Sequence, residues 1–98
     1  MAEQFHELFT NYFEKLDLYT NAITKAHGKS HPEAFKVREL FEAISKKVKE
    51  AGDDKPDLDT ELAQIREITS NYTIPEDVCE TYAATYNMLS ELDKAYHA

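Results

Sequence analysis

Apolar residues recur along the chain in alternating steps of three and four positions. The first stripe runs through Phe5, Phe9, Tyr12, Leu16, Tyr19, Ile23 and Ala26. Three later stripes share this spacing: Val37, Phe41, Ile44, Val48 and Ala51; Leu58, Leu62, Ile65, Thr69 and Tyr72; and Val78, Tyr82, Thr85, Leu89, Leu92 and Tyr96. Such a repeat places each stripe on one face of an α-helix and is typical of helices that pack at shallow angles.

Glycine, proline and short polar runs separate the four stripes. Gly28 follows the first stripe, where a residue in the left-handed conformation can end a helix. Ser30-His31-Pro32-Glu33 then predicts a new helix that starts with a capping box. Gly52 ends the second stripe, and Asp57 is expected to cap the third helix. Thr73-Ile74-Pro75-Glu76 repeats the proline-glutamate pattern and predicts the start of the fourth helix.

These boundaries predict helices over about 3–27, 32–51, 57–72 and 75–97. Short connections make consecutive helices antiparallel, so we expect an all-α, up-down-up-down four-helix bundle. A chain of 98 residues has no room for a second core, and residues 1–98 are therefore expected to form a single domain.

The charge and the single cysteine narrow the possible functions. Nineteen acidic residues face 11 basic ones, which gives a net charge of −8. Nucleic acids and anionic membranes both require a basic surface, so we expect neither as a partner. No apolar run approaches the roughly 20 residues of a membrane span, and the first residues do not form a signal peptide. Cys79 alone excludes an internal disulfide, which favours a cytoplasmic protein.

Histidines are the main candidates for metal binding. Glu3 and His6 have the Glu-x-x-His spacing of di-metal bundles, but such bundles repeat this spacing on several helices. His27, in the last turn of its predicted helix, is expected to interact with the free carbonyls there. His6 and His27 would lie roughly 32 Å apart on one straight helix, so they cannot bind one metal cluster within a single chain.

The remaining candidates indicate no catalytic chemistry. Cys79 follows Val78 in the fourth stripe and is expected to be a small buried hydrophobe. His97 is the penultimate residue, where a metal ligand is not expected. The chain offers Cys79 no second thiolate and no spaced histidine pair with which to bind zinc. Because the chain also lacks a Ser-His-Asp pattern, a glycine-rich phosphate loop and an HExxH motif, we expect no enzyme activity and no catalytic or cofactor-binding residue.

Two segments resemble the hemerythrin-like di-iron proteins that repair iron–sulfur clusters, the repair of iron centres (RIC) family. Residues 18–33, with His27-Gly28-Lys29-Ser30-His31-Pro32-Glu33, resemble the end of that family's first helix and its first turn. Residues 68–82, with Pro75-Glu76-Asp77-Val78-Cys79, resemble the junction of its third and fourth helices. The resemblance implies a hemerythrin-like fold and a role in iron–sulfur repair.

The same resemblance implies a largely missing set of metal ligands. Family members hold two irons with histidines from all four helices and two bridging glutamates, each four residues after a histidine. His6 falls at the first-helix histidine and is the predicted metal ligand. The second-helix pair is expected near Ala51 and Lys55, and the third-helix histidine near Lys55 to Leu58, where this chain has neither. The fourth-helix pair would begin just beyond His97.

Two functions are therefore compatible with the sequence. The first is a short, non-catalytic binding or accessory module in iron–sulfur repair or in the nitrosative and oxidative stress response, with a protein partner and no cofactor. The alternative is a homodimer that completes an iron site with His6, His27, His31 or His97 and nearby carboxylates. One histidine cannot hold two irons, so the first is preferred.

Overall fold

The computed structural model describes the backbone of residues 2–98 and the side chains of residues 4–98, so the side chain of Glu3 lies outside the described part. The described residues form four α-helices and no strand: α1 (Ala2–His27), α2 (Glu33–Ala51), α3 (Asp59–Ile68) and α4 (Glu80–Tyr96). None of these helices is long and apolar enough to cross a membrane.

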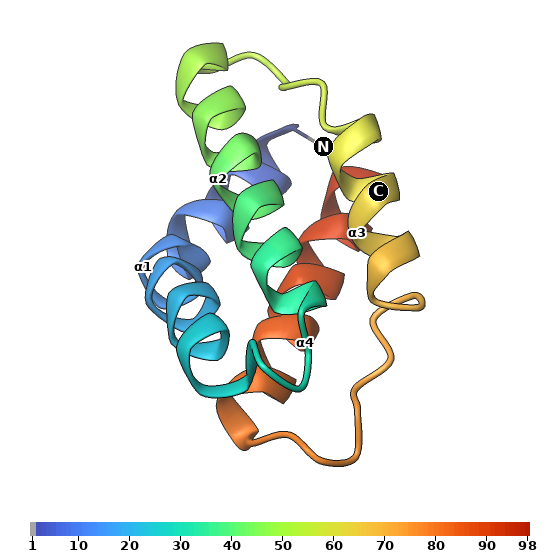
Figure 1. The fold of residues 1–98 in the computed structure, drawn as a ribbon. Helices are drawn as coiled ribbons and strands as arrows, with labels where there is room; N and C mark the ends of the chain where they lie inside the picture. Colours follow the sequence, from blue (N-terminus) through green and yellow to red (C-terminus); the bar gives the residue numbers. More distant parts are fainter. Residues whose placement is uncertain (1) are drawn as a thin grey trace.

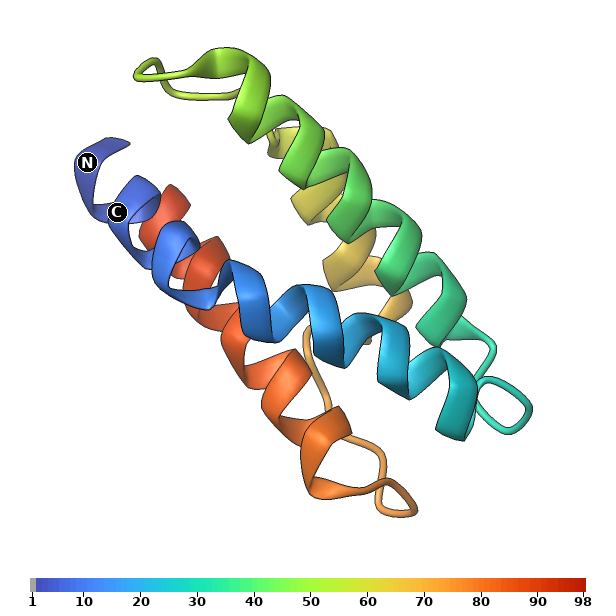
Figure 2. The ribbon, with the colours of Figure 1, turned by 90° about the vertical axis from the view of Figure 1, so that its left-hand side faces the viewer.

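The four helices run alternately up and down the molecule (Figures 1 and 2). α1 packs against both α2 and α4, and α3 packs against α2. In Figure 1, α1 and α3 lie at opposite sides of the bundle, with α2 and α4 between them. Both chain ends lie at one end of the bundle, as expected for an even number of antiparallel helices. The predicted all-α four-helix bundle is confirmed.

The predicted stripes supply most of the core. Fully buried apolar residues from all four stripes include Leu16, Ile23, Val37, Phe41, Leu58, Leu62, Ile65, Tyr82 and Leu89. Each such side chain contributes about 1.5–3 kcal/mol relative to exposure, so this common core holds the four helices together. Phe5 and Tyr96 meet edge to face, with ring centroids 5.5 Å apart, and join the two ends of the chain.

The first turn is built differently from its prediction. Gly28 does not adopt a positive φ, whereas Gly52 does, at φ 60°. Gly28 is required for space instead, because a Cβ there would overlap the Thr24 carbonyl oxygen and lie 2.6 Å from the Phe35 ring. The predicted capping box is also wrong: Pro32 is the N-cap of α2 and no side chain caps it. The Glu33 carboxylate accepts a hydrogen bond from His31 instead.

α3 and α4 are shorter than predicted. Ser70, Asn71 and Tyr72 have φ of 51°, 60° and 64°, and left-handed residues cannot continue a right-handed helix. α3 therefore ends at Ile68 rather than near residue 72. The Pro75 segment forms a turn, which delays the start of α4 to Glu80.

The start of α3 is tied to the end of α4 through Tyr96. Its hydroxyl donates to the Pro56 carbonyl at 2.9 Å and accepts from the Leu58 N–H at 3.0 Å. Leu58 is the N-cap residue of α3, and the carboxylate of Asp57, the predicted cap, accepts a hydrogen bond from the Asp59 N–H at 3.4 Å. The Leu58 N–H, which has no acceptor within α3, is thus hydrogen-bonded to a side chain of α4.

A buried carboxylate joins α3, α4 and the segment between them. Arg66 Nη1 donates to both carboxylate oxygens of Asp93, each at 2.8 Å. The Tyr72 hydroxyl donates to Asp93 Oδ2 at 2.7 Å. His97 Nδ1 lies 2.9 Å from the Asp93 Oδ1 atom. Burial, then the hydrogen bond to Asp93, raises the pKa of the Tyr72 hydroxyl, so this group stays protonated and donates.

Candidate functional site

Three candidate residues from distant parts of the chain meet at one end of the bundle. His27 ends α1, His31 lies in the turn before α2, and Cys79 immediately precedes α4. The rings of His27 and His31 are 6.4 Å apart, and both stand within 6 Å of the Tyr82 ring. The two sequence segments that carry the family resemblance therefore face one another. We call His27, His31 and Cys79, together with Glu33 and Asp77, the His–Cys cluster.

His27 and Cys79 form a thiol–imidazole pair. His27 Nε2 lies 3.2 Å from Cys79 Sγ, and the edge of Tyr82 supports the imidazole. The predicted burial of Cys79 is wrong, because α4 begins one residue later and leaves this side chain exposed. His27 faces the sulfur and not the free carbonyls of α1. An imidazole at this distance can exchange a proton with a thiol.

His31 is held between two carboxylates. Its Nε2 lies 2.9 Å from Asp77 Oδ1, and its Nδ1 lies 3.1 Å from Glu33 Oε2. The hydrogen bond to Asp77 raises the pKa of His31, while desolvation opposes this and Glu33 adds to it. The same bond lowers the pKa of Asp77. The charged pair joins the turn after α1 to the segment before α4.

Two buried tyrosines lie beneath the histidines. The hydroxyls of Tyr82 and Tyr86 are 2.9 Å apart, and desolvation raises the pKa of each. Both phenols therefore stay neutral near pH 7 and act as hydrogen-bond partners rather than as bases. Tyr86 lies beside the predicted stripe of α4 and is buried with the core.

His6 and His97 lie away from this cluster. His6 Nε2 is 2.6 Å from the Gly52 carbonyl oxygen, which can only accept, so this nitrogen carries a proton. Its Nδ1 remains as the possible ligand atom, and His6 as a metal ligand stays a prediction. His97 contacts Asp93 and lies 3.8 Å from Asp59.

The di-iron set that the resemblance implies does not fit a single chain. Within the part of the chain that the structure describes, no three His, Cys, Asp or Glu side chains are grouped so that they could hold a metal ion. In the His–Cys cluster, both nitrogens of His31 already contact carboxylates, which leaves only His27 and Cys79 side by side. Two ligands do not form a stable iron site.

A second feature is an open groove of about 660 Å³ between α1 and α2. Its lining consists of His6, Phe9, Thr10, Phe13, Ser45, Lys46, Val48, Lys49 and Gly52. We call it the α1–α2 groove. The sequence stripes predicted Phe9 and Val48 as core but did not include Phe13, whose ring is 40% exposed.

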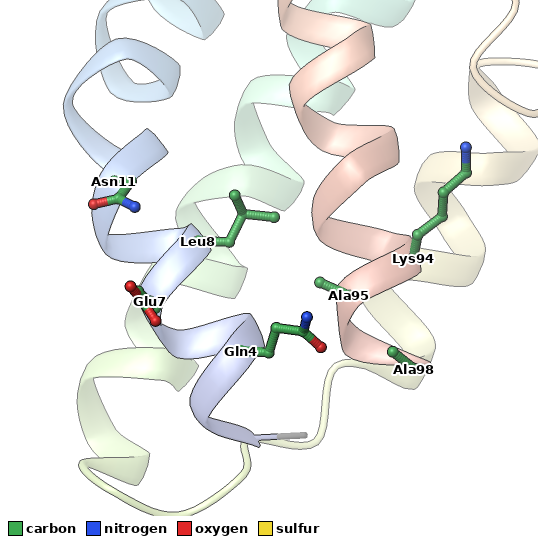
Figure 3. Close-up of a pocket in the computed structure, with 7 residues that line it drawn as sticks. All are labelled: Gln4, Glu7, Leu8, Asn11, Lys94, Ala95 and Ala98. Atoms are coloured by element: carbon green, nitrogen blue, oxygen red, sulfur yellow. The ribbon is translucent and has the colours of Figure 1, made fainter.

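A third hollow lies between the ends of α1 and α4 (Figure 3). It measures about 490 Å³, and Gln4, Leu8 and Ala95 face one another across it. Its lining contains no histidine or cysteine. It therefore carries no evident chemistry.

Comparison with known proteins adds one relationship. The chain matches the iron–sulfur cluster repair protein ScdA from two strains of Staphylococcus epidermidis, with 25% identity over 124 residues. The chain is distantly similar to iron–sulfur cluster repair proteins. The match covers 95% of this chain and 55% of ScdA, so the chain spans about half the length of the curated relatives it matches. No family model and no solved structure matches the chain.

The alignment is longer than the chain itself. Its 124 positions exceed the 98 residues available, so it includes positions at which this chain has no residue. The similarity nevertheless runs across nearly the whole bundle, including both segments that form the His–Cys cluster. The shared pattern therefore belongs to a helical domain and not to one short motif.

Proposed function

We propose that this chain is a short, hemerythrin-like accessory module of cytoplasmic iron–sulfur cluster repair, active under nitrosative or oxidative stress. In this role it binds a partner protein and carries out no catalytic step itself. The distant similarity to ScdA over 95% of the chain supports the repair context. The extra alignment positions and the ten residues of α3 support a short form of the fold.

The position of His6 carries the non-catalytic part of the proposal. His6 is the single residue at an iron-ligand position of the resemblance, and its Nε2 atom bonds the backbone at Gly52. This contact links the start of α1 to the end of α2, which is a structural task. The expected ligand positions near Ala51 and Lys55 carry a methyl group and an ammonium group, and neither can bind iron at neutral pH.

A cellular repair assay tests this function. A strain lacking the chain is exposed to nitric oxide, and the recovery of a cluster-dependent dehydratase is followed with protein synthesis blocked. We expect slower recovery in this strain and full rescue by both the wild-type chain and His6→Ala. Failure of a folded His6→Ala protein to rescue would overturn the non-catalytic role, and unchanged recovery in the deletion strain would overturn the repair role.

One observation favours a second candidate, an iron site completed by a homodimer. A histidine that binds a metal through one nitrogen commonly donates its other N–H to a carbonyl, as His6 does to Gly52. A second chain would supply the missing ligands. Iron that is present per dimer and lost in His6→Ala would establish this candidate.

A further inference from the structure

The α1–α2 groove presents one face of each of two antiparallel helices. His6, Phe9 and Phe13 lie three or four residues apart on α1, and Ser45, Val48 and Lys49 do so on α2. The α1 wall therefore extends for about 10 Å, or two helical turns, and the α2 wall for about 6 Å, or one turn. The groove is open to solvent, and His6 and Gly52 bridge its two walls at one end. An open site suits a segment of another protein better than an enclosed small molecule.

The floor of the groove is apolar. The Phe13 ring lies 5.8 Å from Phe9 and 5.9 Å from Phe41, so an aromatic array underlies it. The hydroxyls of Thr10 and Ser45 donate to carbonyls one turn earlier in their own helices, at 2.9 and 2.8 Å. These hydroxyls therefore need no hydrogen-bond acceptor from an occupant, and the floor of the groove favours an apolar side chain.

The rim of the groove is positive on an acidic protein. Lys46 and Lys49 are exposed, and neither takes part in an ion pair among the described residues, whereas the adjacent Lys47 pairs with Glu61 at 2.8 Å. No carboxylate lines the groove. Two ammonium groups and no carboxylate thus line the groove, which favours an occupant with carboxylates at its edge.

We propose that the α1–α2 groove binds an acidic amphipathic helix of a partner protein. Apolar side chains of that helix, three or four residues apart, would pack on Phe9, Phe13 and Val48, and its carboxylates would face Lys46 and Lys49. This inference rests on the proposed binding role and adds the chemistry of the partner. The occupant is a helix of another protein, and a second copy of the chain is the alternative that the oligomeric state tests below.

A peptide titration tests the groove. The probe is a helical peptide of about 16 residues with Leu on one face and Glu elsewhere, and its counterpart has Lys in place of Glu. Binding to the full chain is followed by amide chemical shifts in NMR. We expect shifts confined to residues 6–13 and 45–52 with the Glu peptide, and binding at least tenfold weaker with the Lys peptide. Equal binding of both peptides, or shifts elsewhere, would overturn the proposal.

Matched variants make the test specific. Phe13→Glu alters the groove, and Leu18→Glu introduces the same charge at a position of α1 that is 65% exposed and outside the lining. Lys46→Glu with Lys49→Glu removes the positive rim without touching the core. We expect Phe13→Glu and the lysine double variant to weaken binding at least tenfold, and Leu18→Glu to leave it unchanged. An equal loss in Leu18→Glu would contradict the assignment.

Three further outcomes test the occupant of the groove and separate this inference from the proposed function. A dimer in light scattering that Phe13→Glu dissociates would assign the groove to self-association and overturn the partner helix. If the Glu peptide does not bind the chain but the deletion strain has a repair defect that the wild-type chain rescues, the groove proposal fails and the repair role stands. If the peptide binds as expected but the deletion strain has no repair defect, the repair role fails and the groove proposal stands.

Discussion

Replacement of Asp93 by alanine is expected to destabilise the bundle more than any exposed substitution. The carboxylate is 8% exposed and receives hydrogen bonds from Arg66 and Tyr72. Its removal leaves the half-buried Tyr72 hydroxyl without an acceptor. Arg66 is 37% exposed and can regain water, which reduces the penalty. We therefore expect a loss of about 3 kcal/mol, at the lower end of the range for fully buried ion pairs.

A loss of this size is large for a small domain. Domains of this length have unfolding free energies of about 5–15 kcal/mol, and each kcal/mol shifts Tm by about 4–8 °C. The Asp93→Ala protein should therefore melt about 12–24 °C below the wild type. Urea unfolding followed by far-UV circular dichroism measures the change directly, and a lower midpoint with an unchanged slope would indicate lost stability in a two-state transition.

Two further variants decide whether the network is responsible. Asp59→Ala removes a carboxylate that is 73% exposed, and we expect a loss below about 1 kcal/mol. Tyr72→Phe combined with Asp93→Ala completes a double-mutant cycle, in which we expect a coupling of about 1–2 kcal/mol. The reasoning is refuted if Asp93→Ala costs no more than Asp59→Ala, or if the coupling is zero.

Three other predictions follow from the end of the bundle near the His–Cys cluster. Gly28→Ala should lower stability by about 1–3 kcal/mol, because its Cβ has no space; an unchanged melting temperature would contradict this. The folded-state pKa of His31 is raised above its ordinary value of 6.5, so its stabilising effect is complete below pH 6.5 and is lost as pH rises through the folded value. The urea midpoint of the wild-type protein should therefore fall on going from pH 6 to about pH 9. It should fall less in Asp77→Asn, and an equal fall in both proteins would exclude the His31–Asp77 pair as the cause. The Cys79 thiol should react with an aromatic disulfide more slowly in His27→Gln than in wild type, because the imidazole lies 3.2 Å from Sγ; equal rates would show that the imidazole does not assist the sulfur.

The core was predictable because it depends on local periodicity. Leu16, Val37 and Leu62 lie on stripes that any helical arrangement must bury. Asp93 was not predictable, because a carboxylate is buried only where partners compensate its charge, and Arg66 lies 27 residues away in the chain. Three left-handed residues ended α3 early, and none of them is the glycine that usually marks such a position.

The candidate site was predictable as separate residues but not as an assembly. Spacing rules relate residues on one helix, whereas His27 and Cys79 are 52 residues apart and meet only when α1 and α4 pack together. The α1–α2 groove was less predictable from the sequence than the residues of the His–Cys cluster. Phe13 is an apolar residue outside its stripe, and Lys46 and Lys49 form a local excess of positive charge in an acidic chain.

The central claim is that this chain is a repair module that holds no iron of its own. The iron stoichiometry of the purified protein tests this claim most directly. Native mass spectrometry of untagged protein, purified without chelators after iron supplementation, reports bound metal and oligomeric state in the same spectrum. The account predicts a chain mass without stoichiometric iron in both the wild-type protein and His6→Ala. Two irons per chain or per dimer, lost in His6→Ala, would contradict it and establish a di-iron protein.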